Sequence, residues 1–171
     1  MLNKFLCCLK SPKALLLAKF KSQPKYKIFD LNNISANCYV NSVYDGDTIR
    51  IIIPIELRVH NFHNTEHILI NTITPEIINY ELRVRLYGID TPEIKPLLTI
   101  PNRKEHIDKA TLARDYLSSL ILNKIVKIEF MNNDKYGRPL VNIFLNNEHI
   151  NDLMITNNHA KPYFGKKKLN F

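Results

Sequence analysis

The amino-acid sequence predicts an α+β fold, a five-stranded OB-fold β-barrel with two main α-helices. Five segments have the alternating or apolar pattern of strands: residues 38–44, 48–53, 83–87, 125–131 and 139–145. One long helical segment lies between the third and fourth strands, and a short one follows the fifth. This order of elements matches an OB-fold barrel, which binds nucleic acids on one face.

The charge of the chain is concentrated near its beginning. Seven lysines and one aspartate lie within residues 1–30 of the 171 residues, so this segment carries +6 of the formal net charge of +8. We therefore divide the chain into a basic N-terminal tail, residues 1–30, and a domain, residues 31–171, which we expect to be monomeric. Because the domain carries only +2, it must bind a polyanion through local arginines.

The N-terminal tail contains two adjacent cysteines, Cys7 and Cys8, among apolar residues and lysines. Three interpretations stay open: S-palmitoylation with peripheral membrane association, an organellar presequence, or a disordered basic tail. Leu2 excludes N-myristoylation, which requires glycine. We find no convincing secretory signal and no run approaching the roughly 18 apolar residues of a membrane span. Localisation stays unknown, with an intracellular site favoured and membrane association through the tail left open.

The helices and turns are predicted from periodicity and from asparagine. Residues 103–122 have a stripe at 3.6-residue spacing that we assign to the core: Ala110, Ala113, Leu117, Leu120 and Ile121. Cys38 is expected to be a small core residue rather than part of a disulfide. Asn146 and Asn147 can close a hairpin, since asparagine tolerates positive φ. Asn151 is expected to be the N-cap of the short helix, and Asn158 its left-handed C-cap.

The stretch Arg85–Glu93 combines a cation, two carboxylates and a rigid corner. Pro92 forces Thr91 into an extended conformation, so the Thr91 carbonyl is held between Asp90 and Glu93. This arrangement suits a hard cation and leaves one carboxylate over. The alternative is a strand that runs into a turn with ordinary surface charges.

Two further turns bear on this choice. Asp45-Gly46-Asp47-Thr48 is an acidic turn between the first two strands, and Asp134-Lys135-Tyr136-Gly137-Arg138 is a turn between the last two. Taken alone, each is ordinary hairpin chemistry. Together and in this order, the sequences DGDT, Arg85 with DTPE, and DKYGR resemble the staphylococcal (thermonuclease-like) nuclease family. The resemblance extends from about residue 38 to residue 163.

The residue types suggest a role for each position, and the family resemblance implies the main ones. Asp47, Asp90 and the Thr91 carbonyl offer oxygen ligands, which favour Ca²⁺. Asp45 is expected to brace the turn. Arg85 and Arg138 are expected either to hold the phosphate or to form structural ion pairs, and the family resemblance implies the first. Glu93 is expected to orient or deprotonate the attacking water. Three residues are candidate substrate contacts: Lys135, Tyr136 and Tyr163.

The resemblance also implies the reaction, a Ca²⁺-dependent endonuclease activity on DNA and RNA with little sequence preference and 3′-phosphate products. Two alternatives are a catalytically inactive OB-fold module that binds nucleic acid and a membrane-tethered interaction protein. Retention of the acids and arginines favours the enzyme.

The chain departs from the family at about residues 54–80, an insertion that either extends a hairpin or forms a surface flap. The irregular spacing of His60, His63 and His67 within it argues against a zinc site.

Overall fold

The computed structural model describes residues 31–65 and 68–165, all within one compact unit, Leu31–Phe171. The hypotheses about the N-terminal tail, including lipidation of Cys7 and Cys8, lie outside these residues. Within the described ranges, no helix has the length and apolar character needed to cross a membrane.

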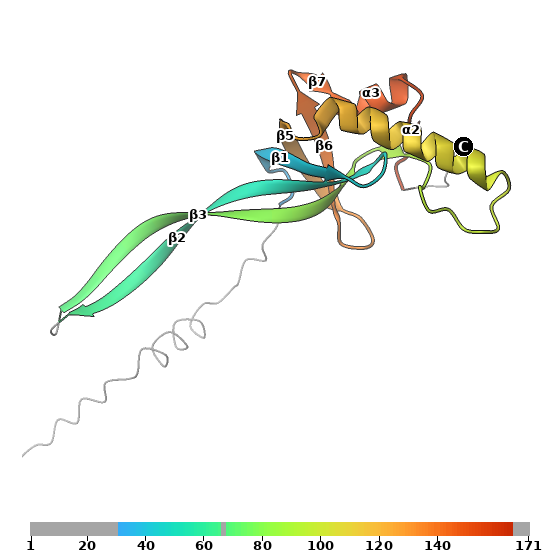
Figure 1. Ribbon diagram of the computed structural model, residues 1–171. Helices are drawn as coiled ribbons and strands as arrows, with labels where there is room; N and C mark the ends of the chain where they lie inside the picture. The colour runs from blue at the N-terminus through green and yellow to red at the C-terminus, as the bar shows by residue number, and fades with distance from the viewer. Residues whose placement is uncertain (1–30, 66–67, 166–171) are drawn as a thin grey trace, which may run out of the picture. The chain divides into compact units, whose positions relative to one another are not determined.

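Five strands close into a barrel, as the sequence predicted (Figure 1). They are β1 (Ser35–Val43), β2 (Thr48–Thr65), β3 (Ile68–Leu86), β5 (Ile125–Asn133) and β6 (Pro139–Leu145). The order β3-β2-β1-β5-β6 is antiparallel throughout. The ring is closed by a short parallel pairing of β3 with β6, at Arg85 with Leu140 and Leu86 with Val141. We call this pairing the closing seam.

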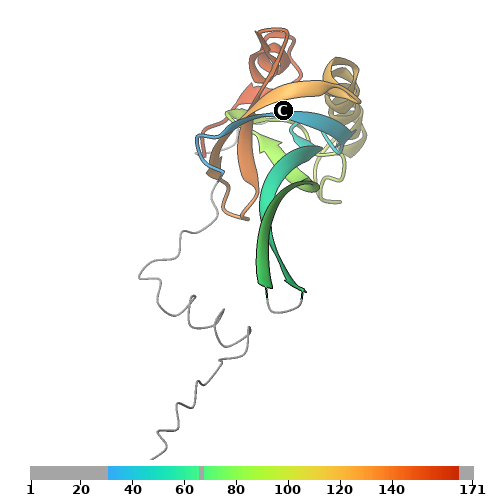
Figure 2. The ribbon, with the colours of Figure 1, turned by 90° about the vertical axis from the view of Figure 1, so that its left-hand side faces the viewer.

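Two helices and three short strands complete the unit. Helix α2 (Arg103–Ile121) packs beside β1, and α3 (Ile150–Thr156) packs beside β6 (Figure 2). Strand β7 (Glu148–His149) extends the sheet next to β6. Strand β4 (Ile89–Asp90) pairs antiparallel with β8 (Lys161–Pro162), which brings the C-terminal part of the unit beside the strand that carries Asp90.

The core lies inside the barrel and under α2. Alternate residues of each strand point inward, so Ile49, Ile51 and Ile53 of β2 are all buried. Helix α2 buries four of the five residues in its predicted stripe, and Leu120 is partly buried at the edge. Cys38 is fully buried as predicted, and burial raises the pKa of its thiol to about 11.

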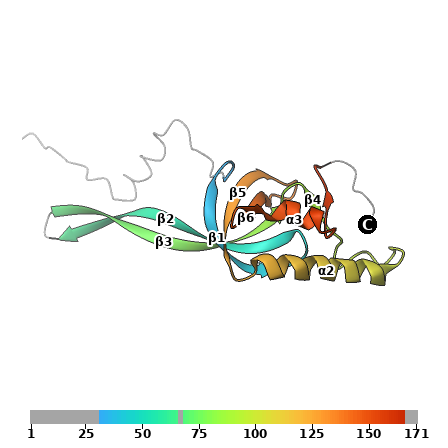
Figure 3. The ribbon, with the colours of Figure 1, turned by 90° about the horizontal axis from the view of Figure 1, so that it is seen from above.

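Residues 54–80 extend the β2–β3 hairpin, which was one of the two expectations for this insertion. Strand β1 pairs with β2 only as far as Ile52. Beyond that point β2 and β3 pair with each other out to Thr65 and Ile68 (Figure 3). Each strand therefore has a free edge, where the missing N–H groups of Pro54 and Pro75 are tolerated.

The asparagine predictions have mixed outcomes. Asn146, Asn147 and Asn158 have φ values of 50°, 68° and 60°, the left-handed conformation predicted for them, but the C-cap of α3 is Asn157 rather than Asn158. The assignment of Asn151 as an N-cap was wrong, because His149 occupies that position.

Asn151 instead lies in the first turn of α3 and is 1% exposed. Its Oδ1 accepts a hydrogen bond from the Ile143 N–H at 3.1 Å, and its Nδ2 donates to the carbonyls of Tyr87 at 2.9 Å and Val141 at 3.0 Å. The side chain therefore satisfies main-chain groups on both sides of the closing seam rather than at the end of its own helix.

Candidate active site

The turn from Asp45 to Asp47 is pressed against Thr91 and helix α2. A Cβ atom on Gly46 would lie 2.8 Å from Thr91 Cγ2 and 2.9 Å from Ala113 Cβ. The φ angle of Gly46 is not positive, so this position needs glycine for close approach rather than for turn geometry. The close approach brings the acidic turn alongside Asp90 and Thr91.

The turn itself is held by local hydrogen bonds. The Asp47 N–H donates to Asp45 Oδ1 at 3.2 Å, so Asp45 braces the turn as expected. The N–H groups of Tyr44 and Asp45 both donate to the Thr48 carbonyl, at 2.9 and 3.3 Å.

A second tight turn leads from β3 into β4. Gly88 has a φ of 75°, and a Cβ atom there would lie 3.1 Å from the Phe164 ring. The Gly88 carbonyl accepts a hydrogen bond from the Tyr163 N–H at 2.8 Å. This turn carries Arg85 and Asp90 to the same place, and it ties Tyr163 to the site.

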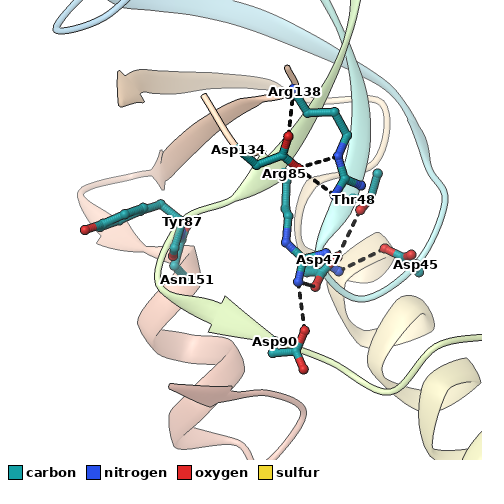
Figure 4. Close-up of polar contacts among 9 residues, drawn as sticks. All are labelled: Asp45, Asp47, Thr48, Arg85, Tyr87, Asp90, Asp134, Arg138 and Asn151. Carbon is teal, nitrogen blue, oxygen red and sulfur yellow. Dashed lines mark hydrogen bonds and ion pairs between the residues drawn. The ribbon is translucent and has the colours of Figure 1, made fainter. Parts of the chain in front are cut away.

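Arg85 bridges the two buried aspartates (Figure 4). Its Nη2 lies 2.6 Å from Asp47 Oδ2 and 2.8 Å from Asp90 Oδ1, and its Nη1 donates to Asp47 Oδ1 at 3.1 Å. Thr48 Oγ1 also donates to Asp47 Oδ1, at 2.9 Å. Asp47 and Asp90 are 2% and 4% exposed, so the cluster is almost removed from water.

Burial raises the pKa of the Asp47 carboxyl to about 7, while Arg85 opposes this rise and Asp45 adds to it. The ionised form of Asp47 is stabilised by its ion pair with Arg85 and by the hydrogen bond from Thr48.

A Ca²⁺ ion at this position would need oxygen donors from the surrounding residues. Among the described residues, no three His, Cys, Asp or Glu side chains form a ready-made cluster. The candidate donors are the carboxylates of Asp47 and Asp90, both of which also contact Arg85, and the main-chain carbonyl of the buried Thr91. These oxygens fit a hard cation such as Ca²⁺, which takes roughly six to eight oxygen ligands in all, so water and phosphate would supply the ligands beyond these three.

Arg138 is held by Asp134, a residue to which the sequence assigned no role. Arg138 Nε and Nη2 each lie 2.7 Å from Asp134 Oδ2, and Asp134 Oδ1 accepts the main-chain N–H groups of Tyr136 and Arg138. Burial acts to raise the pKa of Asp134, but these hydrogen bonds and the guanidinium together lower it. The sequence did contain a signal for this ion pair: an acidic residue at the start of a tight turn, four residues before an arginine.

The predicted site residues line two pockets that share a wall. The first, of about 250 Å³, is lined by all six predicted catalytic and metal-binding residues: Asp47, Arg85, Asp90, Thr91, Glu93 and Arg138. The second, of about 600 Å³, is lined by the predicted substrate contacts Lys135, Tyr136 and Tyr163. Arg85, Glu93 and Arg138 line both pockets.

The first pocket also contains residues that the sequence did not single out. They are Tyr44, Arg83, Ile94 and Lys95. Arg83 had a detectable signal, because it lies two residues before Arg85 on the same strand and so on the same face. Lys95 and Tyr44 had none.

Comparisons with known proteins agree with the motifs. Residues 83–170 match the family model described as "Staphylococcal nuclease homologue". Two probable staphylococcal-like nucleases from Oryza sativa subsp. japonica are 35% and 34% identical over 92 residues. A staphylococcal-like nuclease from Arabidopsis thaliana is 30% identical over 93 residues. These matches cover 54% of this chain but only 22–25% of the relatives, so the chain spans about a quarter or less of their length.

Proposed function

Because the chain belongs to the staphylococcal nuclease family, we propose that it is a Ca²⁺-dependent endonuclease that hydrolyses phosphodiester bonds in DNA and RNA. We further propose little sequence preference and products with 3′-phosphate ends. The observation that carries the proposal is the convergence of two arginines, one glutamate and two buried aspartates on one pocket.

The balance of charge in that pocket supports a metal-dependent reaction. Its lining includes four acidic residues (Asp45, Asp47, Asp90 and Glu93) and four basic residues (Arg83, Arg85, Lys95 and Arg138). Such a lining has little net attraction for a phosphodiester. Ca²⁺ held by Asp47, Asp90 and the Thr91 carbonyl would give it a net positive charge and act as a Lewis acid toward a phosphate oxygen.

The two arginines are suited to a phosphorus centre that gains negative charge. Arg85 comes from β3 and Arg138 from the turn before β6, so their planar forks approach the pocket from different elements. Asp47 and Asp90 engage part of the Arg85 guanidinium, and Asp134 engages part of the Arg138 guanidinium. The N–H groups that these ion pairs leave over can donate to phosphate oxygens. Donors that are fixed before the reaction stabilise the charge that develops in the transition state.

Glu93 is suited to act on water. It is exposed and lines both pockets, so its carboxylate can reach a water molecule beside a phosphate bound there. We assign it to orienting or deprotonating the attacking water. Lys135, Tyr136 and Tyr163 would contact a nucleotide in the larger pocket, where Lys135 lies over the exposed Tyr136 ring at 4.9 Å.

The test is cleavage of a single-stranded DNA and a single-stranded RNA oligonucleotide, with Ca²⁺ and with a chelator. We expect cleavage only with Ca²⁺. We expect Glu93→Gln and Arg138→Ala to lower kcat by about 10²- to 10⁴-fold while the oligonucleotide still binds. Arg50→Ala is the control, because Arg50 forms an exposed ion pair with Glu81 and lines neither pocket.

The outcome also separates the alternative function. Binding without Ca²⁺-dependent cleavage by the wild type would identify an inactive nucleic-acid-binding module. The end chemistry is checked on the same products, because only a terminal 3′-phosphate changes gel mobility after treatment with a 3′-phosphatase. If Glu93→Gln and Arg138→Ala both cleave at the wild-type rate, the roles assigned to Glu93 and Arg138 are wrong.

A further inference from the structure

Tyr44 and Arg83 form a stacked pair at the edge of the smaller pocket. The guanidinium carbon of Arg83 lies 4.8 Å from the centroid of the Tyr44 ring. Both residues line the pocket of about 250 Å³ that contains Arg85 and Glu93. Tyr44 is 50% exposed, so part of its ring surface is available to a ligand.

The environment of Arg83 differs from that of its neighbour Arg50. The two residues are directly opposite in the β2–β3 register. Arg50 is neutralised by Glu81 at 2.7 Å, whereas no carboxylate among the residues with described side chains forms an ion pair with Arg83. Among these residues, no carboxylate therefore competes with an anionic ligand for the Arg83 guanidinium.

Tyr44 and Arg83 lie on the same turn and the same strand as residues of the proposed cation site. Tyr44 directly precedes Asp45, and the Tyr44 N–H is anchored on the Thr48 carbonyl at 2.9 Å. Arg83 lies two residues before Arg85 on β3, on the same face of that strand. The turn and the strand that supply Asp47 and Arg85 thus also fix Tyr44 and Arg83.

Tyr44 and Arg83 belong to the smaller pocket alone, and the residues that line both pockets separate them from the larger one. Tyr44 and Arg83 line only the smaller pocket, whereas Tyr136 and Tyr163 line only the larger one. Between them are the residues that line both, Arg85 among them. A phosphodiester held at the shared residues has one nucleotide on each side, and each nucleotide then meets a tyrosine.

We propose that Tyr44 and Arg83 form a second nucleotide subsite, on the opposite side of the scissile phosphate from Tyr136 and Tyr163. Tyr44 stacks on a base and Arg83 contacts the adjacent backbone phosphate. Stacking on a ring tolerates every base, so the subsite selects for nucleic acid rather than for sequence. This inference rests on the proposed nuclease function.

The test uses a dinucleoside monophosphate, which has a single scissile bond, and its two derivatives that lack the base on one side or the other. Tyr44→Ala should lower kcat/KM for the complete substrate roughly tenfold. It should have no effect on the derivative that lacks the base facing Tyr44, and the full effect on the other derivative. Tyr44→Phe should retain wild-type kcat/KM, because it keeps the aromatic face.

Arg83 is tested through the salt dependence of binding. Arg83→Ala should weaken binding of a fluorescently labelled single-stranded oligonucleotide and flatten the dependence of log Kd on log salt concentration. Tyr39→Ala and Arg50→Ala are the matched controls, since both side chains are exposed and lie outside the two pocket linings. Thermal unfolding of each variant establishes that it is folded.

The possible outcomes distinguish this inference from the proposed function. An active wild type with equal losses on all three substrates, or with no loss in Tyr44→Ala, would overturn the subsite and leave the nuclease proposal intact. If the wild type cleaves nothing, the nuclease proposal fails, and oligonucleotide affinity then decides about the subsite. Unchanged affinity in both Tyr44→Ala and Arg83→Ala would overturn it.

Discussion

Replacing Gly46 with alanine should separate the acidic turn from Thr91 and weaken both the fold and the proposed Ca²⁺ site. The added Cβ would lie 2.8 Å from Thr91 Cγ2, and 2.9 Å from both Thr91 Cβ and Ala113 Cβ. None of these atoms belongs to a long side chain that can rotate away, because threonine is stiff at χ1 and the alanine Cβ is fixed to the backbone of α2.

Overpacking of this kind costs about 1–3 kcal/mol, and three contacts below 3.0 Å place Gly46→Ala near the upper end. The corresponding drop in Tm is roughly 5–10 °C for a domain of this size. The displacement also moves Asp47 away from Thr91, so the rise in Tm on adding Ca²⁺ should shrink. Both quantities are measured by thermal unfolding across a Ca²⁺ titration.

A double variant supplies the control. Thr91→Ser removes the Cγ2 methyl that makes the shortest contact but keeps the main-chain carbonyl. Gly46→Ala combined with Thr91→Ser should therefore lose less stability than the sum of the two single changes. Wild-type Tm and Ca²⁺ response in Gly46→Ala, or strict additivity in the double variant, would show that the close approach is not what holds the turn.

Three further predictions concern single residues. Asn151→Leu should lower the free energy of unfolding by about 3 kcal/mol in urea denaturation, because it leaves buried main-chain groups of Ile143 and Tyr87 without their partner. Asp134→Asn should destabilise the protein at neutral pH but not in acid. Folding lowers the pKa of Asp134, so its ionised carboxylate stabilises the protein above the unfolded pKa of 3.8. This stabilisation is lost as the pH falls from 3.8 through the lower pKa of the folded state. Urea unfolding midpoints of both proteins, measured from neutral to acidic pH, test this prediction. Cys38 should resist thiol reagents at pH 8 until the protein unfolds, since it is fully buried with a pKa of about 11. The measurement uses a Cys7→Ser, Cys8→Ser variant, in which Cys38 is the remaining thiol. Rapid labelling of the folded variant would contradict the prediction.

Most of the barrel could be predicted from local periodicity, because each strand and α2 bury one face. The stripe on α2 is an example: a period of 3.6 residues identifies Ala110 and Leu117 as core without knowledge of what covers them. The extended hairpin was less certain. Pro54 and Pro75 argue against continuous strands unless those strands have free edges, and edge status is a tertiary property.

The composition of the site was predictable, but its internal contacts were not. Spacing and turn chemistry identified Asp47, Arg85 and Asp90. The sequence did not reveal that one guanidinium bridges both aspartates, since this depends on how closely two distant turns approach. A glycine between Asp45 and Asp47 is ordinary turn chemistry, yet the structure requires it at position 46 for steric reasons. Asn151 was assigned to a cap because local patterns favour asparagine there, and burial against two strands overrode them.

The barrel is closed by its shortest ladder, and Arg85 is part of it. The Leu86 N–H donates to the Asp47 carbonyl and the Tyr87 N–H to the Val141 carbonyl, both at 2.8 Å, so the same few atoms fasten the ring and aim the guanidinium. Any opening of this joint would release Arg85 before the rest of the sheet comes apart. In the proposed function Arg85 binds a phosphate ester, and this binding would stabilise the closed ring. Occupancy of the site would then increase the protection of these amides from hydrogen exchange.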